Sequence, residues 1–452
     1  MAKVIVIGDS MLDIYVHGDV TRISPEAPVP ILKETHRTYN LGGAANVAAN
    51  LKALNVDVLL LTIVGTDVNT TVLDQLLNSK NINTYIDYYR GKTITKTRYV
   101  GNNQQILRVD EEKQGETNSV SEDKFLLAIE THFKSIAYLE YIILSDYNKG
   151  VLTPSLIRRI FALVEGTPVK VLVDTKKESI ELFYGAHLIT PNENELEKLI
   201  GVGTNIDEAS DCVDYILVTK GPKGMTLVDR AESYDIPALK NTMVDVSGAG
   251  DTVIATMAYG LLNKKGDLLN IARLANLAAS IVVNKSGTAV CSELELNHAI
   301  RRGELKHYRK EELISLVKEW KEDGLVVGFV NGCFDMLHAG HLNLLREAKK
   351  HCDRLIVAIN SNESVTRLKG LDRPLNLERE KSLAAIPEVD AVIVFNESTP
   401  FDLIKNIQPN LHFVGPDYSC EQAVAIQEQT GIIIVPFLHL NKDISTSKIY
   451  DL

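Results

Sequence analysis

The sequence has 452 residues, of which 45% are hydrophobic and 24% charged, and its formal net charge is −11 at pH 7. This length exceeds one ordinary domain, so we expect two or three domains with sizeable cores. The negative charge argues against a dedicated nucleic-acid or membrane-surface binder, because such proteins need an excess of Lys and Arg. No apolar run approaches the length of a membrane span, and residues 3–8 are too short for a signal peptide.

The five cysteines are scattered and form no CxxC pair. This usage is typical of reduced thiols and predicts a cytoplasmic protein rather than a disulfide framework. The short basic run KK at residues 176–177 is assigned to a solvated loop or rim.

In chain order, Val- and Ile-rich runs alternate with helical patterns through the first 300 residues. Strands are expected at 3–8, 56–65, 141–146, 169–174, 187–190 and 215–221, and helices at 44–54, 70–79 and 154–166. This alternation predicts a parallel sheet with helices on both faces. Residues 29–34 and 93–110 instead alternate apolar and polar side chains, which predicts a small antiparallel sheet projecting from the body. Two long helices near 249–264 and 268–284 close the block.

Residues 292–324 are polar, helical and mixed in charge, and a new series of strands and helices begins at Leu325. We therefore expect an α/β protein with a first domain at 1–303, a connector helix at 304–324 and a smaller, Rossmann-like α/β domain at 325–452.

The segment DVSGAGDT at 245–252 precedes a strong helical pattern. Its glycines let backbone N–H groups converge at a helix N-terminus, which suits an anion. Asp251, in the first helical turn, could take a proton from an attacking hydroxyl while the amides hold a transferred phosphoryl group. Taken alone, the segment is more typical of a glycine turn followed by an acidic helix start, because short glycine motifs recur by chance.

Other segments at the ends of expected strands agree with phosphate chemistry. TPNENE at 190–195 puts Asn192 and Glu195 at a spacing that suits hydrated Mg²⁺, although the same spacing resembles a capping box. GDSMLD at 8–13 ends the first strand with Asp9 and Asp13, and NLGGAANVAANL at 40–51 places Asn46 at a helix start.

In this order, LGGAANVAANL, TPNENE, LVTKGPKGM and DVSGAGDT resemble the ribokinase-like sugar kinase family over residues 1 to about 303. The resemblance implies a three-layer domain with a β lid that excludes water. It implies that Asp251 is the catalytic base and that Ser247, Gly248, Ala249 and Gly250 form the anion hole. Mg·ATP would be organised by Asn192, Glu193, Asn194 and Glu195, with Glu195 reaching Mg²⁺ through the phosphates. Thr219, Gly221, Gly224 and Asn276 would surround the nucleotide, and Asp13, Gly42, Gly43 and Asn46 would contact the sugar.

A second signature, NGCFDMLHAGH at 331–341, follows the apolar run GLVVGF. Zinc binding is not expected, because no CxxC pair or third clustered histidine lies nearby. A histidine hydrogen-bonded to the backbone is the ordinary structural alternative, but it does not explain a pair beside two glycines. His338 and His341 at a strand-to-helix turn can donate to a nucleoside triphosphate and stabilise the leaving pyrophosphate.

This segment resembles the GxFDxxHxGH signature of the nucleotidyltransferase superfamily that includes cytidylyltransferases. RLKGLDRPL at 367–375 and ISTSKI at 444–449 resemble its later phosphate-binding segments, although each taken alone is typical of a solvated loop or a helix cap. The resemblance implies that His338 and His341 act in catalysis. It implies that nucleotide and phosphates are held by Asn331, Gly332, Phe334, Asp335, Lys369, Arg373, Asp417, Ser445, Thr446 and Ser447.

The order of the two signatures resembles the bacterial family of bifunctional heptose-7-phosphate kinases and heptose-1-phosphate adenylyltransferases, most closely at 22–31, 102–110, 144–150 and 367–374. The resemblance implies heptose phosphates and ATP as substrates, Mg²⁺ as cofactor, and a homodimer joined through the lid sheet. A different sugar, or a sugar sensor without catalysis, remains an alternative. A flavokinase fused to an FAD synthetase is disfavoured, since that family has the opposite domain order.

Overall fold

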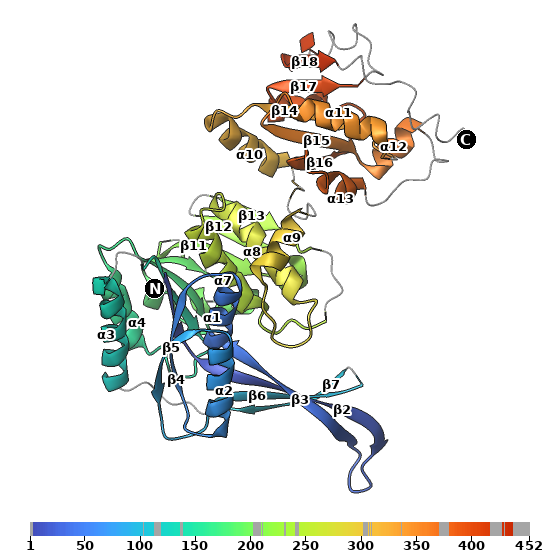
Figure 1. Ribbon diagram of the computed structural model, residues 1–452. Coiled ribbons are helices and arrows are strands. Elements are labelled where there is room, and N and C mark those ends of the chain that lie inside the picture. The colour runs from blue at the N-terminus through green and yellow to red at the C-terminus, as the bar shows by residue number, and fades with distance from the viewer. Residues whose placement is uncertain are drawn as a thin grey trace. The chain divides into compact units, whose positions relative to one another are not determined.

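The structure is a computed structural model that describes residues 3–436 except 103, 113–118, 136–138, 202–208, 210, 230–231, 240–243, 302–305, 307, 309, 336, 370–378, 416–426 and 429. The chain forms two compact units, Met1–Leu296 and Asn297–Leu452, each with its own sheet (Figure 1). No helix among the residues described is long and apolar enough to cross a membrane.

The first unit is built on a nine-stranded sheet in the order β13-β12-β11-β10-β9-β8-β1-β4-β5. Its strands are β1 (Val4–Gly8), β4 (Val58–Val64), β5 (Asn83–Tyr88), β8 (Tyr141–Asp146), β9 (Lys170–Thr175), β10 (Ala186–Ile189), β11 (Val213–Thr219), β12 (Met225–Asp229) and β13 (Ser233–Ile236). The strands from β5 to β11 are parallel, as expected, because apolar runs buried on both faces need helices above and below. The antiparallel edge β11-β12-β13 and the edge strand β5 were not predicted.

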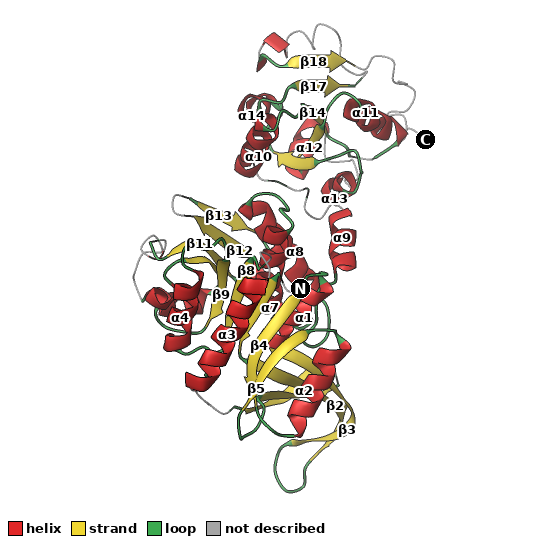
Figure 2. Ribbon diagram, turned by 60° about the vertical axis from the view of Figure 1, so that its left-hand side comes forward, coloured by secondary structure: helices red, strands yellow, loops and turns green. Residues whose placement is uncertain are grey.

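Helices cover both faces of this sheet (Figure 2). They are α1 (Ala44–Ala53), α2 (Val68–Ser79), α3 (Ser119–Ser135), α4 (Pro154–Val164), α5 (Glu193–Ile200), α7 (Ala249–Leu262), α8 (Leu268–Val282) and α9 (Glu293–Arg301). The expected helices near 249–264 and 268–284 are confirmed as α7 and α8. Helix α1 is buried on nearly every side, because its alanines let it pack closely between the sheet and α7.

A separate four-stranded sheet projects from the first unit and matches the expected lid (Figure 1). Its order is β3-β2-β6-β7, with β2 (Ser10–Ile23), β3 (Pro30–Gly43), β6 (Thr95–Gly101) and β7 (Gln104–Glu111). The long strand β2 was not predicted. The expectation of a purely antiparallel sheet was also wrong, since β2 and β6 pair in parallel. The chain between them passes through β4 and β5 of the large sheet, so β6 re-enters the lid in the same direction as β2.

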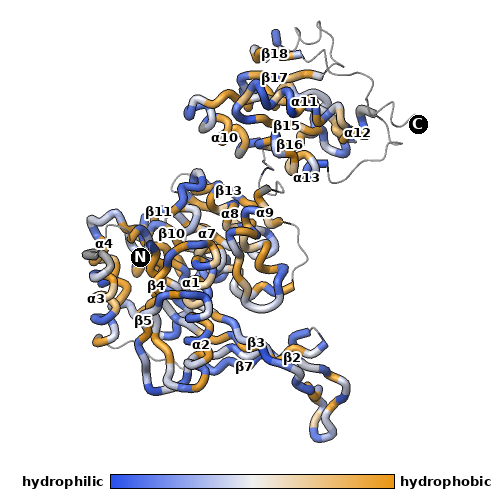
Figure 3. The backbone as a smooth tube through the Cα atoms, in the orientation of Figure 1, coloured by the Kyte–Doolittle hydropathy of each residue, from blue (hydrophilic) through white to orange (hydrophobic). Residues whose placement is uncertain are grey.

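The second unit has a five-stranded parallel sheet in the order β16-β15-β14-β17-β18. Its strands are β14 (Val327–Gly332), β15 (Arg354–Asn360), β16 (Ala391–Phe395), β17 (Leu411–Val414) and β18 (Ile433–Pro436). Its helices are α10 (Lys310–Glu322), α11 (Ala339–Lys349), α12 (Asn362–Lys369), α13 (Arg379–Ala384) and α14 (Phe401–Ile407). Helix α10, from the expected connector, packs Leu313 and Val317 into the core of this unit. Figure 3 shows hydrophobic segments along the central strands of each unit.

Candidate active sites

The first candidate site lies where α7 begins. Gly248 is the N-cap of α7 and has φ 80°, a conformation that favours glycine. A Cβ there would lie 2.6 Å from Nδ2 of Asn46. The glycine therefore lets the turn close over α1, and it carries Asp251 into a buried position where only 2% of its surface is exposed.

Two neutral donors hold the Asp251 carboxylate. Nδ2 of Asn46 donates to Oδ2 at 2.8 Å, and the hydroxyl of Tyr147 donates to Oδ1 at 2.8 Å. Burial raises the pKa of Asp251 to about 6, while both hydrogen bonds lower it and the negative charge of Asp13 raises it. The carboxylate is therefore ionised at neutral pH but basic enough to accept a proton from a substrate hydroxyl.

Two backbone N–H groups of the turn before α7 already have hydrogen-bond partners within the turn. The backbone N–H of Ser247 donates to Asp245 at 2.9 Å, and that of Ala249 donates to the carbonyl of Val246 at 3.3 Å. A Cβ added at Gly250 would meet nothing within 4 Å, so the space above the first turn of α7 is open. Of the four residues predicted to form an anion hole, the two glycines thus remain the best placed for that role, which stays a prediction.

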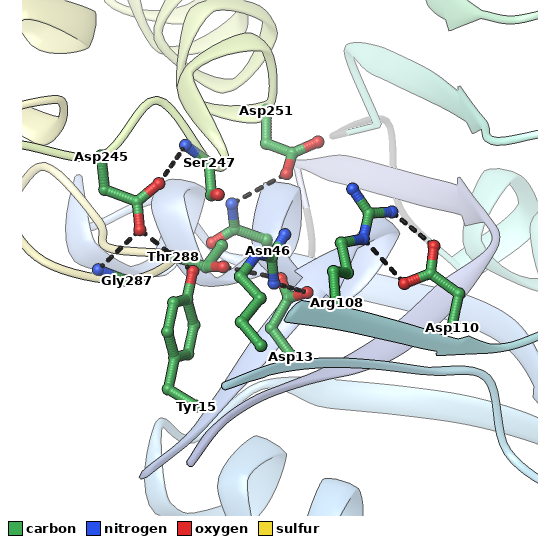
Figure 4. A network of polar contacts seen from close by, with 11 residues as sticks. Asp13, Tyr15, Asn46, Arg108, Asp110, Asp245, Ser247, Asp251, Gly287 and Thr288 are labelled. Atoms are coloured by element: carbon green, nitrogen blue, oxygen red, sulfur yellow. Dashed lines mark hydrogen bonds and ion pairs between the residues drawn. The ribbon is translucent and has the colours of Figure 1, made fainter. Parts of the chain in front are cut away.

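Two of the predicted sugar-side residues, Asp13 and Asn46, lie in the same polar network as this base (Figure 4). Asp13, 4% exposed, accepts from Nη1 of Arg98 at 2.8 Å and from the hydroxyl of Thr288 at 2.6 Å. Gly42 faces Asp13 closely, since a Cβ there would lie 2.7 Å from Oδ2. Asn46 faces the base rather than open space. The structure thus brings Asp13, Gly42 and Asn46 to one place, while Gly43 caps α1 with φ 60°.

A second carboxylate ties the same region together. Asp245 accepts the hydroxyl of Tyr15 at 3.2 Å and the backbone N–H groups of Ser247 and Gly287 at 2.9 and 3.1 Å (Figure 4). It therefore fixes the turn before α7 to lid strand β2 and to the loop that carries Thr288.

The predicted nucleotide residues meet at the ends of β10 and β11. Asn192 caps α5 and forms a full capping box with Glu195, with both reciprocal hydrogen bonds at 2.9 Å. The structural alternative for this pair is therefore present, and a magnesium role stays a prediction. Asn192 also pairs with Thr219, whose N–H donates to the carbonyl of Pro191 at 2.9 Å. Among these residues, Asn192, Asn194 and Glu195 line a pocket of about 270 Å³.

Glu195 shares the lining of this pocket with Lys176, Lys177 and Lys198, whose ammonium groups suit phosphate oxygens. Burial raises the pKa of Asp174 well above its ordinary value, and the nearby charges of Asp251 and Glu195 raise it further. Among the residues the structure describes, no group of three or more His, Cys, Asp or Glu side chains could hold a metal ion by itself, so a magnesium role here stays a prediction.

Three other predicted nucleotide residues have structural roles. Gly224 has φ 97°, and a Cβ there would lie 2.1 Å from the carbonyl oxygen of Ile236. Asn276, on α8, donates from Nδ2 to the carbonyl of Pro237 at 2.9 Å. Gly221 opens the turn between β11 and β12. A contact with the nucleotide remains a prediction for all three.

The second candidate site lies between β14 and α11. His338 is the N-cap of α11, and its Nδ1 accepts from the N–H of Gly340 at 3.1 Å. The rings of His338 and His341 stack with centroids 3.9 Å apart, and Phe334 packs on His341 at 4.8 Å. The hydrogen bond orients one imidazole and the stacking orients the other, so both nitrogen-bearing rings lie at a helix N-terminus, where anions are favoured.

The rest of the signature supports this turn. Oδ1 of Asn331 lies 2.8 Å from Nε2 of His412, whose burial lowers its pKa to about 4, so this imidazole is neutral. Gly332 lies under Phe334, and a Cβ there would meet the ring at 3.0 Å. Asp335 is buried, with 2% of its surface exposed.

Sequence comparisons match both units to known families. Residues 1–295 match the pfkB family of carbohydrate kinases, and residues 329–451 match the cytidylyltransferase-like family. The bifunctional protein HldE of Caulobacter sp. (strain K31) is 40% identical over 446 residues, which cover 94% of this chain and 90% of that protein. HldE of Coxiella burnetii (strain Dugway 5J108-111) is 38% identical over 472 residues, which cover 100% and 97%. The chain belongs to the pfkB and bifunctional HldE families.

Solved structures agree on the fold of the first unit. Phosphofructokinase-2 from Escherichia coli matches with a TM-score of 0.55 and 17% identity, covering 66% of this chain and 97% of that one. Ribokinase from Thermotoga maritima matches with a TM-score of 0.52 and 18% identity, covering 67% and 100%. The ribokinase-like fold expected for this HldE family member is therefore confirmed.

Several residues at the two sites were missed. Lys176 and Lys177, assigned to a solvated loop or rim, line the pocket with Asn192 and Glu195. Tyr147 was not assigned a role, although it contacts the base. In the second unit, Arg379 is only 4% exposed and donates to the carbonyls of Cys333 and Asn360 and to Oδ1 of Asn362. It joins the signature loop to β15 and α12.

Some predicted residues lie outside the described part of the chain. They are Arg373, Asp417, Ser445, Thr446 and Ser447, together with the side chain of Lys369. Their assignment to nucleotide and phosphate binding stays a prediction.

Proposed function

We propose that this HldE family member phosphorylates heptose 7-phosphate at C1 with ATP and, in its second unit, transfers AMP from ATP to heptose 1-phosphate. The product is ADP-heptose, a precursor of the lipopolysaccharide core, and a separate phosphatase removes the 7-phosphate between the two steps. The observation that carries the proposal is the buried Asp251, held by two neutral donors at the open N-terminus of α7.

In the first reaction, Asp251 takes the proton from the C1 hydroxyl while that oxygen attacks the γ-phosphorus of ATP. A new C1–O–P bond forms, the bond to the β-phosphate oxygen breaks, and ADP leaves. The N–H groups of Gly248 and Gly250 receive the charge on the transferred phosphoryl group, and Asp13 binds a sugar hydroxyl. Asn192 and Glu195 would hold Mg²⁺ with the phosphates, where it supplies positive charge.

In the second reaction, an oxygen of the C1 phosphate attacks the α-phosphorus of a second ATP, and pyrophosphate leaves. His338 and His341 donate hydrogen bonds to the phosphates as charge builds up on the pentacoordinate phosphorus and the leaving group. The N-terminus of α11 adds its favourable potential. No covalent intermediate with the protein is needed.

The test is identification of the products. The full chain is incubated with heptose 7-phosphate and ATP, and then with the phosphatase and further ATP. We expect heptose 1,7-bisphosphate in the first stage and ADP-heptose with pyrophosphate in the second. Sugar binding without turnover would instead support the sensor alternative, and turnover of another sugar phosphate alone would support a different substrate.

We also propose that the kinase domain ends near residue 303, that the protein is cytoplasmic, and that it forms a homodimer through the lid. The support for the dimer is the exposed apolar side chains on and beside the lid strands, Ile23, Val29, Leu107 and Val109. The edge strand β7 is exposed along its length and offers unpaired backbone groups. Sedimentation of the full chain tests this, and a monomer at micromolar concentration would contradict it.

A further inference from the structure

The hydroxyl of Tyr147 is one of two donors to the Asp251 carboxylate, and it comes from a loop that the sequence argument left without a role. Tyr147 follows β8 directly, and its phenol oxygen lies 2.8 Å from Oδ1 of Asp251. Burial and the charge of Asp251 raise the pKa of Tyr147 well above its ordinary value. The phenol therefore stays protonated and remains a hydrogen-bond donor throughout the working pH range.

The loop that carries this tyrosine is anchored by a buried carboxylate. Asp9, 1% exposed, accepts the backbone N–H groups of Tyr147, Lys149 and Val151 at 2.9, 3.0 and 3.1 Å. Three backbone donors on one carboxylate leave the loop little freedom to turn. The phenol hydroxyl is thus delivered to Asp251 from a fixed backbone.

Two ammonium groups lie over the ring of Tyr147. Nζ of Lys96, on lid strand β6, lies 5.0 Å from the ring centroid, and Nζ of Lys176 lies 4.7 Å from it. Neither lysine has a carboxylate within ion-pair distance among the residues the structure describes. Cations over an aromatic face hold the ring in place and make the phenol a stronger donor.

The charged groups that face Asp251 and Tyr147 come from several elements. Asp13 on β2 and Asp174 on β9 contribute negative charge, and Lys96 on β6 contributes positive charge. Lys176, after β9, acts on Asp174 and lies over the ring. The carboxylates favour protonation of Asp251, whereas Lys96 and the two neutral donors oppose it.

We propose that Tyr147 is a positioning residue for the first phosphoryl transfer: its hydroxyl fixes Oδ1 of Asp251 so that a remaining lone pair of the carboxylate faces the sugar hydroxyl. The same hydrogen bond, together with that from Asn46, favours the ionised form of the carboxylate. This inference rests on the proposed kinase reaction. It adds to that reaction a residue that orients the base without contacting the substrate.

The test is the pH dependence of kcat/KM for the kinase step in Tyr147→Phe. This variant keeps the ring and its cation contacts and removes only the donor. Because the hydrogen bond lowers the pKa of Asp251, its loss raises that pKa, and the acid limb of the profile moves up by about one pH unit. From a pKa of about 6, this shift gives a loss of about tenfold at pH 5, of about threefold at pH 6.5 and of little at pH 8.5.

The matched control is Tyr259→Phe, which removes a phenol donor to Glu293 in the same unit at 2.9 Å. It should leave the pH profile unchanged. Each rate is divided by the folded fraction measured by circular dichroism at the same pH, so a destabilised variant still gives an answer. An unchanged profile in Tyr147→Phe, or an equal loss at every pH, overturns the proposal. Absence of kinase activity in the unaltered protein would instead refute the proposed function.

Discussion

The two candidate sites use the same structural device with different chemistry. In each, a strand of a parallel sheet or the turn after it meets a helix N-terminus, at α7 in the first unit and at α11 in the second. The first helix opens with a buried carboxylate and the second with two stacked imidazoles. The nucleophiles explain the difference. A sugar hydroxyl must lose a proton when it attacks, whereas a sugar phosphate is already ionised and needs only charge stabilisation.

The largest effect should come from Asp251→Asn, which removes the base from only one of the two sites. We expect the kinase rate to fall by at least about a thousandfold, because the hydroxyl must then attack without a proton acceptor. Adenylyl transfer should be unchanged. Separate assays of the two reactions measure this, with Asp19→Asn on the exposed part of the lid as control. An equal loss of both reactions would contradict the assignment of Asp251 to the kinase site alone.

The complementary change is His341→Ala in the second unit. We expect adenylyl transfer to fall by about a hundredfold, since one donor to the phosphates is removed. The kinase step should keep its full rate, and His351→Ala, in the exposed turn between α11 and β15, should affect neither. The rate of adenylyl transfer should not need a deprotonated side chain. A pH profile of this reaction that requires a general base would contradict the proposal that only the first site uses one.

A smaller effect is expected from Arg379→Lys, which tests whether the guanidinium holds the signature loop of the second site in place. Lysine cannot donate in three fixed directions as the guanidinium does, so the signature loop loses part of its connection to β15 and α12. Adenylyl transfer should fall by about tenfold while the kinase step is unaffected. The exposed Arg346→Lys on α11 is the control. A wild-type rate of adenylyl transfer in Arg379→Lys would contradict the positioning role of Arg379.

The smallest effect concerns stability. The folded-state pKa of Asp251, about 6, lies above its ordinary value of 3.8. The ionised carboxylate therefore destabilises the folded unit above about pH 6, and this penalty vanishes below the ordinary value. Asp251→Asn should stabilise the unit by about 1–3 kcal/mol at pH 8 and by little at pH 4. Thermal unfolding at both pH values checks this, and a gain confined to low pH would contradict the assigned pKa.

What could be predicted from the sequence was local. The Gly-Ala-Gly-Asp turn and the paired histidines each lie within one short segment, so spacing alone placed Asp251 and His338 at helix starts. The parallel runs were recognised because a strand buried on both faces is continuously apolar. The pair Asn192 and Glu195 shows the limit of such reasoning, because one spacing fits both a capping box and a cation site.

The rest depends on contacts between distant segments. Tyr147 reaches Asp251 across 104 residues, and Arg379 reaches Cys333 across 46. Nothing in their immediate neighbours indicates these partners. The parallel pairing of β2 with β6 likewise follows from the path of the chain through the large sheet, which alternation of side chains does not encode.

The central claim is that one chain carries two chemically independent sites, and mixing two inactive variants tests it most directly. Asp251→Asn and His341→Ala are each supplied with heptose 7-phosphate, ATP and the phosphatase. Each alone should make almost no ADP-heptose, and an equal mixture should restore its formation, because each variant supplies the step that the other lacks. A mixture that remains inactive, although each variant retains its own partial reaction, would contradict the account.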